Sequence, residues 1–266
     1  MSENGAGGPG RKVVPMAAAE LATAVLGELA GMASEEGRAG MARYGINVEH
    51  AFGVSVYELR RVAKRLGVDH ELALSLWATG NHEARVLAGM VDDPALVSPA
   101  QMDAWAAGFD SWDLCDQVTS NLFDKTPFAH AKVREWSAAD SEWVKRAAFA
   151  TAAALAVQDK AAADGRFLEI LELVRREAGD GRNYVKKAVN WALRNIGKRN
   201  PELHAAALET AAAILATADA LAAGDRKDPA ARSARWVARD ALRELRSEKT
   251  LLRLRRGSAA QPPREG

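Results

Sequence analysis

Helix signals recur along nearly the whole chain, and strand signals are absent. Ser, Asn or Pro repeatedly precedes a run rich in Ala, Leu and charged residues, as at helix starts, and glycine often follows such a run. No stretch alternates apolar and polar residues between turn residues, which is the pattern of a half-buried strand. The pattern therefore predicts an all-α protein.

The cap signals also indicate where the helices lie. Ser55 with Glu58 three residues later forms a capping box, and Gly67 ends that helix. Residues 34–40 are predicted to be a break. The expected helices cover residues 17–33, 55–65, 70–79, 81–91, 99–108, 111–123, 127–136, 141–157, 166–178, 183–198, 201–222 and 230–256.

From residue 70 onward the predicted helices come in pairs, and the second helices begin alike. Stacking these similar helix starts is expected to put Arg85, Asp116, Arg146 and Lys187 in register, at spacings of 31, 30 and 41 residues. Helix pairs of this length stack into an α-α superhelix, a solenoid, of five to six pairs with one charged residue per repeat along its concave face. The alternative is ordinary helix punctuation, since such caps recur in any all-helical protein.

Composition narrows the class of protein. One cysteine among 266 residues excludes an intramolecular disulfide and a cysteine-based zinc site, and the five histidines show no metal-ligand spacing, so no metal or cofactor is expected. We find no run of about 18 apolar residues and no signal-peptide pattern, so we expect a cytoplasmic monomer with no membrane contact. Residues 14–256 are predicted to form one domain between disordered tails at 1–13 and 257–266.

The charge is divided unevenly along the chain. Residues 1–126 hold 10 Lys/Arg and 17 Asp/Glu, whereas residues 127–256 hold 25 Lys/Arg and 17 Asp/Glu. The run 182–199 has six Lys/Arg, including Lys186, Lys187 and Arg194, and no acid. This asymmetry indicates a polyanionic partner with phosphate contacts from this run, although a solvated helical surface with mixed charge would look similar.

The stretch Ser111-Trp112-Asp113-Leu114-Cys115-Asp116 carries the candidate chemistry. Read as a helix capped by Ser111, it places Trp112 and Asp116 four residues apart on one face, with Asp113 pointing elsewhere in a structural role. An aromatic wall beside a carboxylate suits a flat, cationic ligand. The residues alone favour a structural role, in which Asp116 complements a helix start or pairs with Arg146 across repeats.

Several segments together resemble a known family. Residues 41–44 (MARY), 111–116 (SWDLCD), 143–148 (WVKRAA) and 185–194 (VKKAVNWALR) resemble, in order and spacing, the DNA alkylation repair family of AlkD-type HEAT-like repeat DNA glycosylases. The resemblance spans roughly residues 41–201, and the Ala- and Arg-rich extension after Ala222 departs from it. It implies a HEAT-like superhelix that binds duplex DNA and removes cationic N3- and N7-alkylated purines.

The resemblance also implies roles for single residues. The catalytic carboxylate falls on Asp116, the two tryptophans that flank the lesion fall on Trp112 and Trp191, and an arginine that contacts the DNA backbone falls on Arg146. Arg85, Lys186, Lys187 and Arg194 are the further candidates for DNA binding. Most tryptophans lie in protein cores, so we assign Trp77, Trp105, Trp136 and Trp236 to helix packing.

Two functions stay open from the sequence. The first is a monofunctional alkylpurine DNA glycosylase, in which Asp116 stabilises positive charge that develops on the deoxyribose and positions water. The second is a non-catalytic helical-repeat protein that binds DNA or a protein partner, since one fold serves both uses.

Overall fold

The computed structural model describes residues 17–259, with side chains described through residue 256. Within this range it has fourteen α-helices, one short 3-10 helix and no strand, so the prediction of an all-α protein is confirmed. The helices are α1 (Ala18–Gly31), α2 (Glu35–Arg43), α3 (Val56–Leu66), α4 (His70–Ala78), α5 (His82–Val91), α6 (Pro99–Ala107), α7 (Trp112–Asn121), η1 (Phe123–Lys125), α8 (Ala129–Trp136), α9 (Glu142–Gln158), α10 (Asp164–Glu177), α11 (Asn183–Ile196), α12 (Pro201–Gly224), α13 (Pro229–Leu245) and α14 (Glu248–Ala259).

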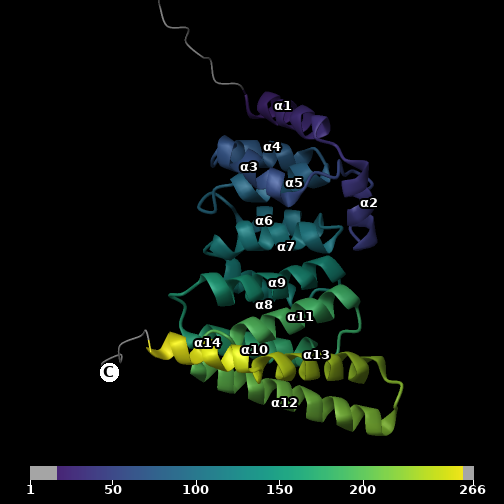
Figure 1. Cartoon of the computed structure of the whole chain (residues 1–266), viewed down its shortest axis with the longest axis vertical. Coiled ribbons are helices and arrows are strands. Elements are labelled where there is room, and N and C mark those ends of the chain that lie inside the picture. Colours follow the sequence, from purple (N-terminus) through teal and green to yellow (C-terminus); the bar gives the residue numbers. More distant parts are fainter. Residues whose placement is uncertain (1–16, 260–266) are drawn as a thin grey trace, which may run out of the picture.

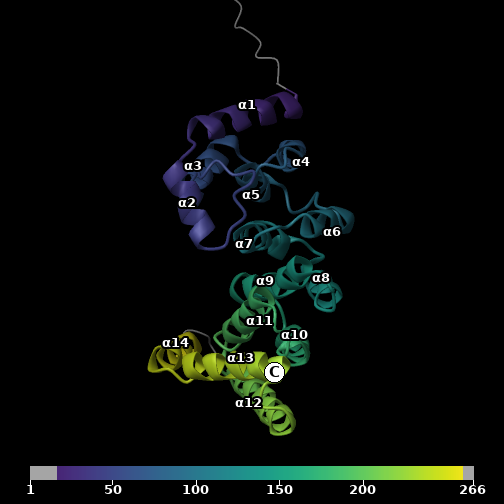
Figure 2. The same ribbon diagram turned by 90° about the vertical axis from the view of Figure 1, so that its right-hand side faces the viewer.

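Five consecutive helix pairs stack along the long axis of the molecule, from α4–α5 to α12–α13 (Figure 1). The second helices α5, α7, α9, α11 and α13 contact one another in sequence and form an inner row, while α4, α6, α8, α10 and α12 form an outer row. Figure 2 shows α6, α8 and α10 on one side of the inner row and α2 and α14 on the other. We call the side that carries α2 and α14 the inner face.

Each inner-row helix from α5 to α11 starts at an identifiable cap, and the caps set the register of the repeats. They are Asn81, Ser111, Ser141 and Arg182. Asp116, Arg146 and Lys187 each lie five residues after their caps, so they occupy equivalent positions. Arg85 lies four residues after Asn81, which turns it about 100° around its helix and out of the predicted register.

Helix α9 is the centre of the core. It is buried from Arg146 to Ala156, and most of these residues are alanines, which let α7, α8 and α11 approach closely on several sides. Between the rows, Trp105 and Trp136 are buried, and Trp77 stacks on Trp105 at 4.2 Å. These three tryptophans serve packing, as predicted.

Two segments differ from the sequence prediction. The predicted break at residues 34–40 is helix α2, capped by the Ser34 side chain, although none of its residues is buried. The predicted basic helix over 230–256 is two helices, because the chain breaks at Arg246 and Ser247 before α14. The predicted tail 1–13 lies outside the described residues, and helix α14 extends to Ala259, into the predicted tail 257–266.

Helix α12 bears on the expectation of no membrane contact. It is the one helix of the described part of the chain that is long and apolar enough to cross a membrane by length and composition. Leu203, Ala207, Ala211, Ile214 and Ala218 form its buried face, which packs on α10 and α13. A core helix of a soluble protein meets the same two criteria, so this is weak evidence for a membrane span.

Candidate functional site

The face shared by Trp112 and Asp116 lies on α7 and points toward the inner face. Trp112 donates its indole N–H to the carbonyl oxygen of Tyr44, at 3.0 Å, in the segment that leaves α2. Asp116 follows one turn later on the same side of α7, with 18% of its side chain exposed. The structure thus places the predicted aromatic and carboxylate side by side along one helix.

Asp116 forms a bidentate ion pair with Arg146 of α9. Arg146 donates from Nε to Oδ1 at 3.0 Å and from NH2 to Oδ2 at 2.8 Å. Its NH1 donates to the carbonyl oxygen of Tyr184 on α11 at 2.7 Å, and its side chain is only 6% exposed. All three guanidinium nitrogens therefore bond within the protein. This pairing across repeats is the alternative that the sequence left open for Asp116, and it holds the carboxylate in one orientation.

Burial raises the pKa of the Asp116 carboxyl above its ordinary value, and the Arg146 guanidinium opposes this shift only in part. The Arg146 guanidinium favours the ionised form of this carboxyl, and an environment with little water strengthens electrostatic interactions between the carboxylate and a nearby cation. Such a group can stabilise positive charge that develops beside it.

The segment after α2 connects α7 to α11 through two neighbouring carbonyl groups. Tyr44 accepts from Trp112 of α7, and the next carbonyl, that of Gly45, accepts from the Tyr184 hydroxyl of α11 at 3.3 Å. Gly45 has a φ of 73°, and a Cβ there would lie 2.6 Å from the Tyr184 hydroxyl oxygen, so only glycine suits this position. The Tyr44 side chain is 76% exposed at the edge of the site.

Glu83 anchors the far end of that segment. Its buried carboxylate accepts from the backbone N–H groups of Phe52, Gly53 and Val54 at 2.7–3.1 Å. Sequence analysis missed both Glu83 and Tyr184. Glu83 looks like an ordinary first-turn acid after Asn81, and the sequence gave no signal for Tyr184 beyond its place in the first turn of the helix predicted over 183–198. The two rings pack at 5.0 Å.

Helix α11 carries the second predicted tryptophan. Trp191 is partly buried and packs against the core, four residues after Lys187 and on the same side of the helix. Lys187 is exposed and has no hydrogen bond or ion pair to any described residue. Because Lys187 is equivalent in register to Asp116 and Arg146, this stripe of α11 continues the surface that α7 and α9 begin.

The other predicted DNA-binding residues have partners inside the protein. Arg85 stacks on Trp77 at 5.1 Å and donates to the carbonyl oxygens of Trp77 and Gly108, away from the Asp116 site. Its loss of register explains this, so the expected place of Arg85 on the inner face is wrong. Arg194 bonds to Glu244, and Lys186 lies 5.5 Å from the Trp236 ring.

Asp113 has the structural role predicted for it. It forms an ion pair with His82 of α5, with 3.0 Å between Oδ2 and Nε2. Burial acts to lower the pKa of His82, but the Asp113 carboxylate outweighs it and the pKa is raised; the same contact lowers the pKa of Asp113. The pair joins the first turns of α5 and α7.

Comparisons with known proteins agree with this architecture. The sequence model of a family described as DNA alkylation repair enzyme matches residues 25–245. A solved structure described as "a new family of proteins related to the HEAT-like repeat DNA glycosylases with affinity for branched DNA structures" is 26% identical over 72% of this chain and 82% of its own, with a TM-score of 0.64. No curated protein matches the chain.

Proposed function

Since the chain belongs to the DNA alkylation repair family, we propose that it is a DNA glycosylase that hydrolyses the N-glycosidic bond of cationic N3- and N7-alkylated purines in duplex DNA. The observation that carries this proposal is the Asp116 carboxylate, held by Arg146 one turn from Trp112 on the inner face. A protein that only binds DNA has no need of a partly desolvated carboxylate beside an anionic backbone.

The lesion supplies much of the driving force. An N7- or N3-alkylated purine is cationic, so it leaves as a neutral base when its bond to C1′ breaks. The electron pair of that bond goes to the base nitrogen, and positive charge develops on the deoxyribose. Asp116 stabilises this charge and positions the water whose oxygen bonds to C1′, while the water's proton passes to the carboxylate or to solvent.

The tryptophans have a complementary part in the proposal. Trp112 is held by its bond to Tyr44, and Trp191 lies on the equivalent stripe of α11. Their ring faces favour a cationic sugar between them through the negative charge density of the indole. The Lys187 side chain, free of protein partners in the described structure, contacts backbone phosphates.

The test is release of base from DNA that contains N7-methylguanine. We expect wild-type protein to release it and Asp116→Asn to be slower by about 10–1000-fold, the range for the loss of one electrostatic or acid–base group. Binding to undamaged duplex should be unchanged or stronger in Asp116→Asn, because an anion near the phosphates is removed. Equal release by the two proteins would refute the role of Asp116.

A second candidate function is binding of DNA without catalysis. The similar solved structure is described as having affinity for branched DNA, and here Arg146 occupies both oxygens of Asp116. A wild-type protein that binds a four-way junction more tightly than duplex and releases no alkylated base would favour this function.

A further inference from the structure

The exposed side of α13 carries an unusual row of residues. Residues 229–256 hold nine Lys/Arg and three Asp/Glu. Successive exposed positions at four- and three-residue steps run along one side of α13 and resume on α14: Arg232, Trp236, Arg239, Arg243 and Arg246, then Lys249, Arg253 and Arg256. We call this set the α13–α14 basic row.

Most cationic side chains of the row lack a partner in the protein. Arg243 pairs with Asp240, but the side chains of Arg232, Arg239, Arg246 and Arg253 have no hydrogen bond or ion pair to a described residue. From Arg232 to Arg246 the row advances 14 residue steps, or about 21 Å of helix, which matches the axial rise of about six phosphates of one DNA strand. Evenly spaced cations of one sign suit a linear polyanion better than a compact ligand.

Trp236 interrupts the row, which corrects its assignment to packing. Its side chain is 40% exposed, and Lys186 of α11 lies over the ring at 5.5 Å. Lys186 directly precedes Lys187, the unpaired cation of the proposed DNA surface, so the row borders that surface across α11 and α13. An exposed aromatic among cations is typical of nucleic-acid surfaces.

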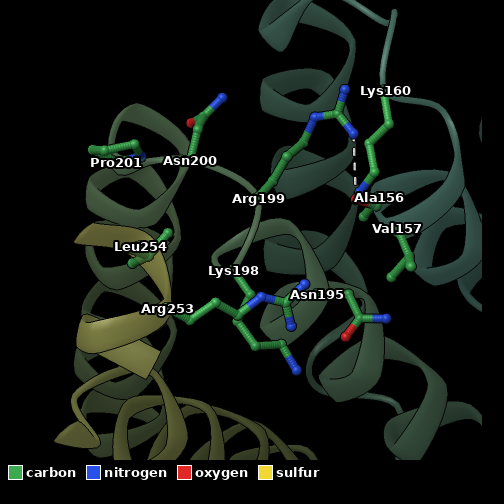
Figure 3. Close-up of a pocket in the computed structure, with 10 residues that line it drawn as sticks. All are labelled: Ala156, Val157, Lys160, Asn195, Lys198, Arg199, Asn200, Pro201, Arg253 and Leu254. Atoms are coloured by element: carbon green, nitrogen blue, oxygen red, sulfur yellow. Dashed lines mark hydrogen bonds between the residues drawn. The ribbon is translucent and has the colours of Figure 1, made fainter. Parts of the chain in front are cut away.

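At its far end the row reaches a basic cavity of about 240 Å³ between the ends of α9 and α11, the start of α12 and α14 (Figure 3). Lys160, Lys198, Arg199 and Arg253 line it. A neighbouring cavity of about 620 Å³ shares Lys198 and Arg253 and adds Lys249. Arg199 bonds to the carbonyl oxygens of Ala156 and Ala162, and Lys198 shares Glu244 with Arg194, so one carboxylate serves two cations.

We propose that the α13–α14 basic row binds the phosphates of a run of DNA beyond the run held beside Asp116, with Lys198 and Arg253 taking a phosphate at the cavity. Excess positive charge with so few protein partners is neutralised by backbone phosphates, which release counterions. Helix α14 lies outside residues 25–245, the part that the family model matches, so it extends the DNA contact of the shared domain. The proposal rests on the DNA binding proposed above.

The test compares two triple variants that remove equal charge. One is Arg239→Ala/Arg246→Ala/Arg253→Ala in the row, and the control is Arg134→Ala/Arg166→Ala/Arg175→Ala on the outer-row helices α8 and α10, where all three are exposed. The dissociation constant for an undamaged duplex of about 30 base pairs is measured against salt concentration for both and for wild type.

We expect the plot of log affinity against log salt to become shallower by about two to three in the row variant, with affinity at low salt falling about 10–500-fold. The control should stay near wild type, and single-turnover release of N7-methylguanine at saturating protein should be unchanged in the row variant. Trp236→Ala should lower affinity without changing the slope. Equal slopes for the row variant and wild type would overturn the proposal.

Two further outcomes separate the possible failures. If the wild-type protein does not bind duplex DNA, the proposed function and this inference are both refuted. If it binds DNA and releases base, and the row variant binds DNA like the wild type, only this inference is refuted. Anionic phospholipid vesicles serve as the competing partner, because Leu251 and Leu252 are exposed on α14. Vesicle binding that depends on the row while DNA binding does not would assign the row to a membrane surface instead.

Discussion

Replacing Arg146 with methionine tests how Asp116 is held. The substitution keeps a long side chain in the space beside α7 and removes the only cation bonded to Asp116 in the described structure. Removing one partner of a fully buried ion pair costs about 3–5 kcal/mol, because the other charge is left without compensation. Asp116 retains 18% exposure, so water offsets part of this cost, and we expect about 2–3 kcal/mol. For a chain of this size the melting temperature should fall by about 4–12 °C.

The pH dependence of this loss follows from the pKa of Asp116. Burial raises the pKa of its carboxyl in the folded protein, and Arg146 limits the rise. A carboxyl with a raised pKa binds its proton more tightly in the folded state, so stability falls as pH rises from the unfolded pKa through the folded one. Without Arg146 the folded pKa is higher, and each further unit costs about 1.4 kcal/mol at neutral pH. The deficit of Arg146→Met should therefore be larger at about pH 8 than at about pH 4.

Urea unfolding at the two pH values measures both quantities. Arg134→Met is the matched control, because Arg134 pairs with Glu169 and both side chains are 60% exposed. That pair should contribute less than about 1 kcal/mol. In the glycosylase assay, activity should fall as the pH is lowered, and the midpoint of this fall should lie at a higher pH for Arg146→Met than for wild type. A deficit like that of Arg134→Met, or one independent of pH, would refute the view that Arg146 compensates a desolvated carboxylate.

Three other substitutions probe separate parts of the structure. Asp113→Asn should leave base release within a few-fold of wild type. Its loss of stability in urea unfolding should be largest between about pH 4 and pH 6.5, and should become smaller at higher pH as His82 loses its proton. Asp124 is buried, both its carboxylate oxygens lack a partner among the described residues, and its pKa is raised to about 6. The free energy of unfolding of the wild type should therefore fall by about 3 kcal/mol as the pH rises from the ordinary pKa of an aspartate to about 6. Urea unfolding should show that Asp124→Asn removes this pH dependence. Lys187→Ala should weaken binding to all duplex sequences alike and make the salt slope shallower by about one, and an unchanged slope would remove Lys187 from the interface.

Local signals determined most of the fold. Cap residues such as Ser55, Asn81 and Ser141 accept a backbone N–H three residues ahead, so their helix starts follow from sequence alone. Trp112 and Asp116 share a face because helical geometry places positions four apart together. Repetition of similar helix starts also indicated a stacked array, and the family resemblance supplied the proposed roles of Asp116, Trp112 and Trp191.

Contacts between distant segments decided the rest. Helix α2 buries no residue, so no apolar pattern predicted it as a helix. Its position depends on hydrogen bonds formed only in the folded protein, in which the carbonyl oxygens of Tyr44 and Gly45 accept from side chains of α7 and α11. The partner of Asp116 depends on stacking α9 against α7, which no local pattern specifies. The contact of Arg85 with the Trp77 ring depends in the same way on how α4 packs against α5.

The C-terminal region shows the same division. Its basic composition was evident from the sequence, but the break after Leu245 that separates α13 from α14 was not. Trp236 was assigned to the core by the general behaviour of tryptophan, yet it lies exposed under Lys186. Sequence determines which side chains are available on each helix face, whereas the packing of one helix on another decides which of those faces remain open to a partner.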